Sequence, residues 1–244
     1  MKNLWSLSKR ELASYFATPV AYVFIVIFLL LAGFLTFQVG GFYQREQADL
    51  VPFFTWHPWL YLFLVPAVTM RLWAEERKTG TIELLMTLPI TLPQAILGKF
   101  LAAWLFALVA LVLTFPIWIT VNALGDPDNG AIAAGYFGSF LMAGGFLAIG
   151  SATSAITRNQ VIAFVLSVVI CFAFLLASFP GFTEFFEGWA PEVISEAIGS
   201  FSFSTHFDAI SKGVLDLRDL VFFGSVIAFF LFLNALILEA KKAE

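Results

Sequence analysis

The chain has 244 residues, of which 60% are hydrophobic and only 12% are charged, whereas roughly 25% of the residues in a soluble domain are charged. It contains 30 Phe and 7 Trp, its formal net charge is -4, and its mean hydropathy is +0.91. This composition excludes a soluble globule and indicates a chain surrounded largely by hydrocarbon.

Six uncharged windows of at least 18 residues separate the charged residues, and each is long enough to cross a bilayer as a helix. We therefore expect an all-α integral membrane protein, with residues 1–244 forming one transmembrane domain. The first apolar run is too long for a signal peptide, so we expect a retained anchor. The six predicted spans cover about residues 20–40, 53–73, 94–122, 131–156, 160–180 and 219–239.

The distribution of Lys and Arg predicts the orientation of these spans. With the N-terminus inside, the cytoplasmic side carries ten basic and six acidic residues, and the outer side carries three basic and eleven acidic residues. Basic residues are retained in cytoplasmic loops, so we expect both termini in the cytoplasm and a location in the cytoplasmic (inner) membrane. No basic patch interleaved with aromatic residues is present, so nucleic acid is not expected as a partner.

An amphipathic segment precedes the first predicted span. Ser8 and Glu11 have the spacing of a capping box, which predicts a helix start, and Thr18-Pro19 interrupts the helix. We therefore expect an interfacial helix over residues 4–17. The alternative is a simple inward extension of the first span. The residues assigned to this helix are Ser8, Lys9, Arg10, Glu11 and Leu12.

The aromatic cluster over residues 53–61 is typical of the headgroup level of a membrane, and His57 lies within it. No His, Cys or carboxylate is placed at metal-ligand spacing from His57, so we interpret it as an ordinary interfacial histidine and expect no metal site. The single cysteine, Cys171, is predicted to be a buried apolar side chain.

The predicted fourth span, residues 131–156, is rich in Gly, Ala and Ser, which indicates close helix contacts. The sequence leaves open whether these contacts lie within the subunit or across a dimer. Pro116 is predicted to kink the third span. Asn234 is the most polar group well inside a span, and we interpret it as a hydrogen bond between helices.

The stretch before the last span has apolar residues at near-helical spacing, which predicts short amphipathic outer helices over residues 183–215. Gly213 suits the C-terminal cap of one of them. The residues predicted to cap the last span are Asp216, Arg218 and Asp219.

The segment between the second and third spans, residues 71–94, is predicted to be cytoplasmic and to form two helical pieces with a turn at Gly80. Thr91 and Gln94 form a second capping box, which opens the third span. A short amphipathic helix in such a loop is suited to a groove on a soluble partner; the alternative is packing on its own membrane domain. Within the segment 74–92, the candidate residues are Glu75, Glu76, Arg77, Lys78, Thr79, Gly80, Thr81, Glu83 and Leu84.

Residues 75–81 (EERKTGT) resemble the signature loop of ABC transporter permeases of the type-2 exporter family, especially the gliding-motility-associated and nitrous-oxide-reductase-maturation permeases. Residues 9–22, 157–160 and 213–220 resemble the same subgroup, so the resemblance covers the whole chain. It implies that the segment 74–92 holds a coupling helix flanked by the N-terminal helix, and that the outer helices are re-entrant. The outer loops are short compared with those of larger permeases of this family.

The chain has no phosphate-binding loop, because Gly98-Lys99 lacks both the upstream glycine and the following hydroxyl residue. It is therefore predicted not to be an enzyme and to bind no cofactor of its own. The expected function is that of the permease subunit of an ABC exporter, with ATP and Mg on a separate cytoplasmic ATPase. A second permease copy or homologue and the lipid bilayer are further expected partners, and a periplasmic or membrane-anchored accessory protein is left open, as is the cargo.

Two other classes of function fit the sequence less well than the permease. The Glu75-Glu76 pair invites comparison with membrane proteases of the prenyl-protein type, which resemble Glu-Glu followed four residues later by Arg, with His on other helices. In this chain the position of that Arg is Gly80, and the histidines His57 and His206 are predicted to lie on the opposite side of the membrane. An ion-coupled secondary transporter would place ionisable groups at membrane depth, yet the predicted span interiors contain none.

Overall fold

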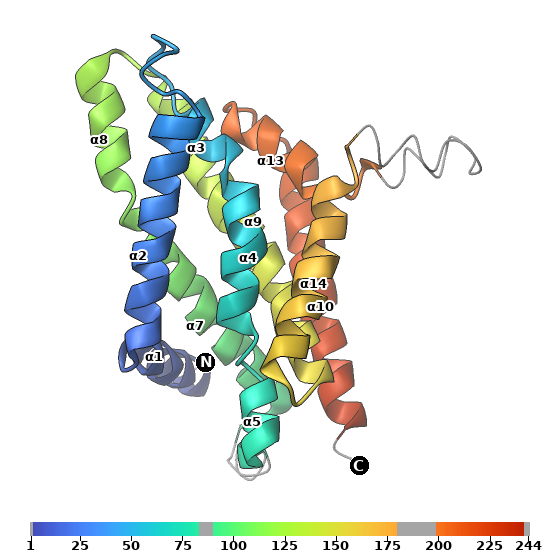
Figure 1. Cartoon of the computed structure of the whole chain (residues 1–244). Coiled ribbons are helices and arrows are strands. Elements are labelled where there is room, and N and C mark those ends of the chain that lie inside the picture. The colour runs from blue at the N-terminus through green and yellow to red at the C-terminus, as the bar shows by residue number, and fades with distance from the viewer. Residues whose placement is uncertain (1, 83–89, 180–198, 242–244) are drawn as a thin grey trace.

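The computed structural model describes residues 2–82, 90–179 and 199–241, and every regular element in these ranges is a helix (Figure 1). The first half of the chain forms α1 (Lys2–Phe16), α2 (Pro19–Phe34), the π-helical turn η1 (Leu35–Val39), α3 (Val51–Thr55), α4 (His57–Thr69) and α5 (Ala74–Thr79). The second half forms α7 (Leu92–Val112), α8 (Phe115–Leu124), α9 (Asn129–Ile156), α10 (Gln160–Leu176), α13 (Phe203–Ser211) and α14 (Leu217–Ala240).

Within the part of the chain that the structure describes, four helical stretches are long and apolar enough to cross a membrane: Pro19–Val39, Leu92–Leu124, Asn129–Ile156 and Leu217–Ala240. The second and fifth predicted spans correspond to the shorter helices α4, with 13 residues, and α10, with 17. A turn at Trp56 separates α3 from α4, and Pro58 lies in the first turn of α4, where its missing N–H costs no hydrogen bond. The count of six spans stays a prediction.

Helix α9 forms the centre of the bundle and packs against α4, α7, α10, α13 and α14 (Figure 1). Its glycines make these contacts close. A Cβ atom on Gly135 would lie 2.5 Å from the Phe54 ring, and one on Gly150 would lie 2.0 Å from Thr69 Oγ1. These contacts, which the sequence left open, therefore lie within the subunit, where close backbone approach increases dispersion attraction between helices.

Helix α1 runs across the end of α2 instead of continuing it, and packs against α7 (Figure 1). The predicted helix start at Ser8 is wrong, because α1 already includes residue 2. Ser8 Oγ donates a hydrogen bond back to Leu4 O at 3.0 Å, as a serine inside a helix does, and the Glu11 carboxylate points to other partners.

Two of the predicted caps form by local hydrogen bonding. Thr91 and Gln94 make a reciprocal capping box at the start of α7. The Asp216 carboxylate accepts the Arg218 N–H at 3.0 Å at the start of α14. After α13, Gly213 adopts φ +87°, a left-handed conformation that favours glycine.

His57, predicted to be an ordinary interfacial histidine, is completely buried within the protein. Its ring centroid lies 4.3 Å from that of Phe53, and its Nδ1 is 2.8 Å from Ser139 Oγ on α9. The aromatic cluster thus packs into the bundle, where Ser139 is a polar partner for the buried Nδ1, while Nε2 has no hydrogen-bond partner among the described residues. Cys171 is buried as predicted, and Asn234 Nδ2 donates to Ser151 Oγ at 2.7 Å, which confirms the predicted bond between helices.

Candidate functional site

The segment predicted to contact a soluble partner begins with α5, which projects from one end of the bundle (Figure 1). Its acidic residues, Glu75 and Glu76, lie in the first turn, and its basic residues, Arg77 and Lys78, lie in the last turn, an order that complements the helix dipole. The helix ends at Gly80 with φ +74°, and a Cβ atom there would meet nothing within 4 Å. Glycine is therefore favoured at this turn by its backbone conformation and not by lack of space.

Ser154 of α9 fixes the chain where it enters α5. Its Oγ accepts the backbone N–H groups of Trp73 and Ala74, each at 3.1 Å, and donates to Met70 O at 3.0 Å. The indole N–H of the fully buried Trp73 donates to Ser151 Oγ at 3.2 Å. Because the first N–H groups of a helix have no partner within it, these serines satisfy donors that would otherwise be buried and unpaired.

Further hydrogen bonds link α5 and α14 to the last turns of α9. Arg77 Nη1 donates to Ala155 O at 2.7 Å, which places a positive charge at the negative end of the α9 dipole. Ser151 also accepts the hydrogen bond from Asn234 of α14. Hydrogen bonds thus connect α5 to α9 directly, and Ser151 joins the adjacent Trp73 to α14.

Lys99 forms the charged centre of this site. Its Nζ lies 2.6 Å from Glu76 Oε1 on α5 and 3.2 Å from Glu11 Oε2 on α1, and it is 5.4 Å from the centroid of the Trp73 ring. The Lys99 side chain is only 5% exposed, and the side chains of Glu11 and Glu76 are 17% and 22% exposed. Removing one partner of an ion pair this buried is costly, because it leaves a charge without compensation.

The same site seats α1 on α7. A Cβ atom on Gly98 would lie 2.6 Å from Leu7 Cδ2, so the glycine allows α1 to approach. The Tyr15 ring stacks on Phe106 with centroids 5.2 Å apart. Burial raises the pKa of the Tyr15 phenol above its usual range, and the Glu11 carboxylate adds to this effect, so the phenol stays neutral.

We call the residues that join α1, α5, α7 and α9 here the junction; they are Glu11, Trp73, Glu76, Arg77, Lys99, Ser151 and Ser154. The exposed residues at this end of the bundle include Glu75, Lys78, Thr79, Gly80 and Thr81. Of the candidates on α1, Lys9 and Arg10 are exposed, Leu12 is half-buried and Ser8 is buried. Glu83, Leu84 and residues 183–198 of the predicted outer helices lie outside the described residues.

The predicted cap of the last span lies at the opposite end of the bundle from α5 (Figure 1). Asp216 caps α14, whereas Asp219 is buried and its Oδ1 lies 2.6 Å from His206 Nδ1 on α13. His206 Nε2 is 2.9 Å from Ser200 O. The Arg218 side chain takes no part in the cap; its backbone N–H does. In the described residues, no group of three or more His, Cys, Asp or Glu side chains is arranged to hold a metal ion.

Sequence reasoning missed Lys99 and the two serines. One signal could have identified Lys99, because it is the only charged residue between Glu83 and Asp126. A lone charge beside an apolar span requires a partner. The serines gave no comparable signal, since Ser151 and Ser154 lie in a helix where small residues already suggest close packing.

The helical bundle, with four stretches able to cross a membrane and a charged junction at one end, defines an α-helical membrane protein. A family model described as ABC-2 family transporter protein matches residues 5–239. The chain belongs to this family and is therefore the membrane permease component of an ABC transporter, a component that usually works with a cytoplasmic ATPase. A search of curated proteins finds no match.

Proposed function

We propose that this chain is the permease subunit of an ABC exporter and that α5, with the residues that follow it, is the element that contacts a separate ATPase. The observation that supports this proposal is the junction at Lys99, which binds Glu76 of α5 and Glu11 of α1 at the same time. Lys78 and Thr79 of α5 are exposed. Ala74, Glu76 and Arg77 of the same helix bond to α7 and α9.

The junction gives a physical route from the ATPase to the membrane helices. A push on α5 would act on α9 through Ser154 and Arg77, on α7 through Lys99, and on α1 through Glu11. Ion pairs and buried hydrogen bonds keep their partner atoms at nearly fixed distances. These helices would therefore tilt together as ATP binding closes the ATPase pair. The movement belongs to the rigid-body class of transitions.

The topology we propose has six spans, with α4 and α10 as the second and fifth. In this arrangement α1, α5 and the C-terminus are cytoplasmic, and their common position at one end of the bundle supports it (Figure 1). The remaining parts of the proposal are a single transmembrane domain in the inner membrane, a second permease copy, re-entrant outer helices before the last span, and ATP and Mg bound by the ATPase. The gliding-motility or nitrous-oxide-reductase-maturation subgroup remains the proposed subfamily.

Co-purification of the ATPase with the tagged chain from its native membrane tests the role of α5. Lys78→Glu reverses an exposed charge on α5 and should lower the amount of co-purified ATPase severalfold, because mutating a charge at the edge of an interface weakens association. Lys212→Glu, at the opposite end of the bundle, is the matched control and should retain the wild-type amount. Equal recovery with both variants would contradict the assignment of α5.

A further inference from the structure

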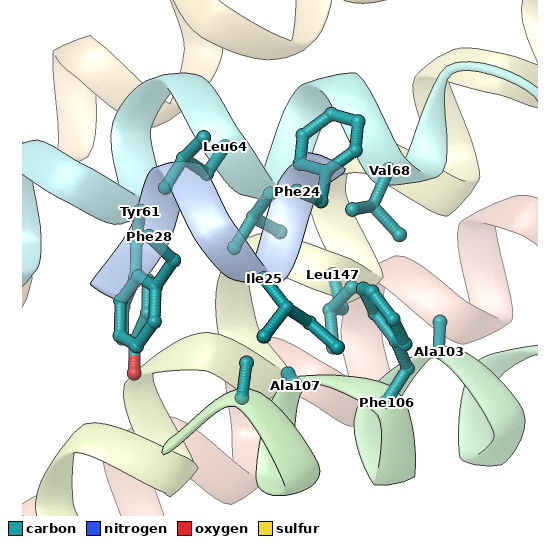
Figure 2. A pocket seen from close by; sticks show the side chains of 12 residues that line it. Phe24, Ile25, Phe28, Tyr61, Leu64, Val68, Ala103, Phe106, Ala107 and Leu147 are labelled. Atoms are coloured by element: carbon teal, nitrogen blue, oxygen red, sulfur yellow. The ribbon is translucent and has the colours of Figure 1, made fainter. Parts of the chain in front are cut away.

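A narrow apolar cavity lies between α2, α4 and α7, and its volume is about 40 Å³. Figure 2 shows side chains from the three helices converging on this space, among them Phe24 and Ile25 of α2, Leu64 of α4, and Phe106 and Ala107 of α7. A narrow space lined by hydrocarbon suits a slender apolar chain better than a bulky ring.

A larger pocket of about 280 Å³ adjoins this cavity on the side of α1 and α5. The two share Phe24, Val68 and Phe106 as lining residues, so they meet at these side chains, and we call them together the groove. Along α2, the polar pocket is lined by the first residues, Val20 and Ala21, and the apolar cavity by residues further along the helix. Since α2 belongs to a stretch able to cross a membrane, this order runs from the membrane surface towards its interior.

Among the described residues, one acid and one base of the larger pocket form no ion pair. Five charged residues line it. Three of them belong to the junction, where Lys99 pairs with both Glu11 and Glu76. The other two, Arg71 and Glu75, are exposed, and neither forms an ion pair with any of the described residues. The pocket therefore offers one cation and one anion at the head of an apolar groove.

We propose that this groove binds one phospholipid whose headgroup carries both a phosphate and a primary ammonium. Arg71 takes the phosphate, because a guanidinium binds phosphate with parallel hydrogen bonds. Glu75 takes the ammonium, and part of one acyl chain enters the apolar cavity. The site lies beside the junction, but its lipid occupancy does not depend on the role of α5 in ATPase contact.

Native mass spectrometry of the permease alone, in mild detergent, measures this binding. Phosphatidylethanolamine, phosphatidylcholine and phosphatidylglycerol with identical acyl chains are added in turn. Phosphatidylethanolamine should bind about tenfold more tightly than phosphatidylcholine, whose quaternary ammonium cannot donate a hydrogen bond to Glu75. It should also bind more tightly than phosphatidylglycerol, which has no ammonium.

Two variants test the two halves of the groove. Ala107→Phe fills the apolar cavity, and Val112→Phe adds the same ring to the same helix at a position that is 58% exposed. The first should lose the lipid and the second should retain it. Arg71→Gln changes an exposed side chain and should weaken binding about tenfold by removing a charge-assisted hydrogen bond. This variant decides the outcome if Ala107→Phe does not fold.

Glycerophosphoethanolamine, which has the headgroup without acyl chains, separates a lipid site from a site for a soluble phosphate compound. At equal concentration it should not displace the lipid. Displacement, equal binding of the three lipids, or wild-type binding by Arg71→Gln would each overturn the proposal. The lipid-binding measurement contains no ATPase, so loss of lipid selectivity would not contradict the role of α5. Equally, loss of ATPase co-purification would not contradict lipid binding.

Discussion

Replacing Lys99 with Met tests the junction most severely, because it removes the cation and leaves Glu11 and Glu76 facing each other. Breaking a buried ion pair by removing one partner costs about 3 to 5 kcal/mol. The two carboxylates here keep 17% and 22% exposure, so water screens part of their repulsion. We therefore expect the free energy of unfolding to fall by about 2 to 4 kcal/mol.

Equilibrium unfolding in mixed detergent micelles, followed by helix content, measures this loss. Lys78→Met is the matched control, since Lys78 is exposed, and it should change the free energy of unfolding by less than about 0.5 kcal/mol. The triple variant Glu11→Gln, Glu76→Met and Lys99→Met should recover most of the loss, because an apolar replacement of a buried ion pair is often neutral. Wild-type stability in Lys99→Met alone would refute the argument that the junction is held by charge.

Three further predictions follow from the described geometry. Gly80→Val should cost about 1 to 3 kcal/mol in the turn because of its left-handed backbone, and should reduce ATPase co-purification while membrane insertion stays normal; wild-type co-purification would contradict a role for this turn. Ser154→Ala should lower the free energy of unfolding by about 1 to 3 kcal/mol, because two buried N–H groups lose their acceptor, and an unchanged value would mean that other groups replace it. A cysteine at Asp128 should react with impermeant thiol reagents outside intact cells and one at Lys78 should not, and the reverse labelling pattern would overturn the proposed topology.

Features set by neighbouring residues were predictable from the sequence. The capping box at Thr91 and the cap at Asp216 involve partners only two or three residues away, and the turn at Gly80 requires only its own φ. The same kind of pattern failed at Ser8, because the spacing of a capping box also occurs inside a helix, and the residues before Ser8 are themselves helical.

Features set by tertiary packing were not predictable. Lys99 meets Glu11 across 88 residues of sequence, and Ser154 reaches Trp73 across 81. His57 has a sequence environment typical of a membrane surface, but it is buried and its Nδ1 bonds to Ser139, 82 residues away. The turn at Trp56, which limits α4 to 13 residues, was not evident from hydropathy, because hydropathy measures apolar length and not where a helix ends.

Site-specific photo-crosslinking in native membranes tests the central claim most directly. A photoreactive residue at Lys78, on the exposed side of α5, should crosslink to an ABC ATPase identified by mass spectrometry, and one at Asp128, at the other end of α9, should not. If the residue at Lys78 gives no ATPase adduct while the one at Asp128 does, the assignment of α5 as the ATPase contact is contradicted.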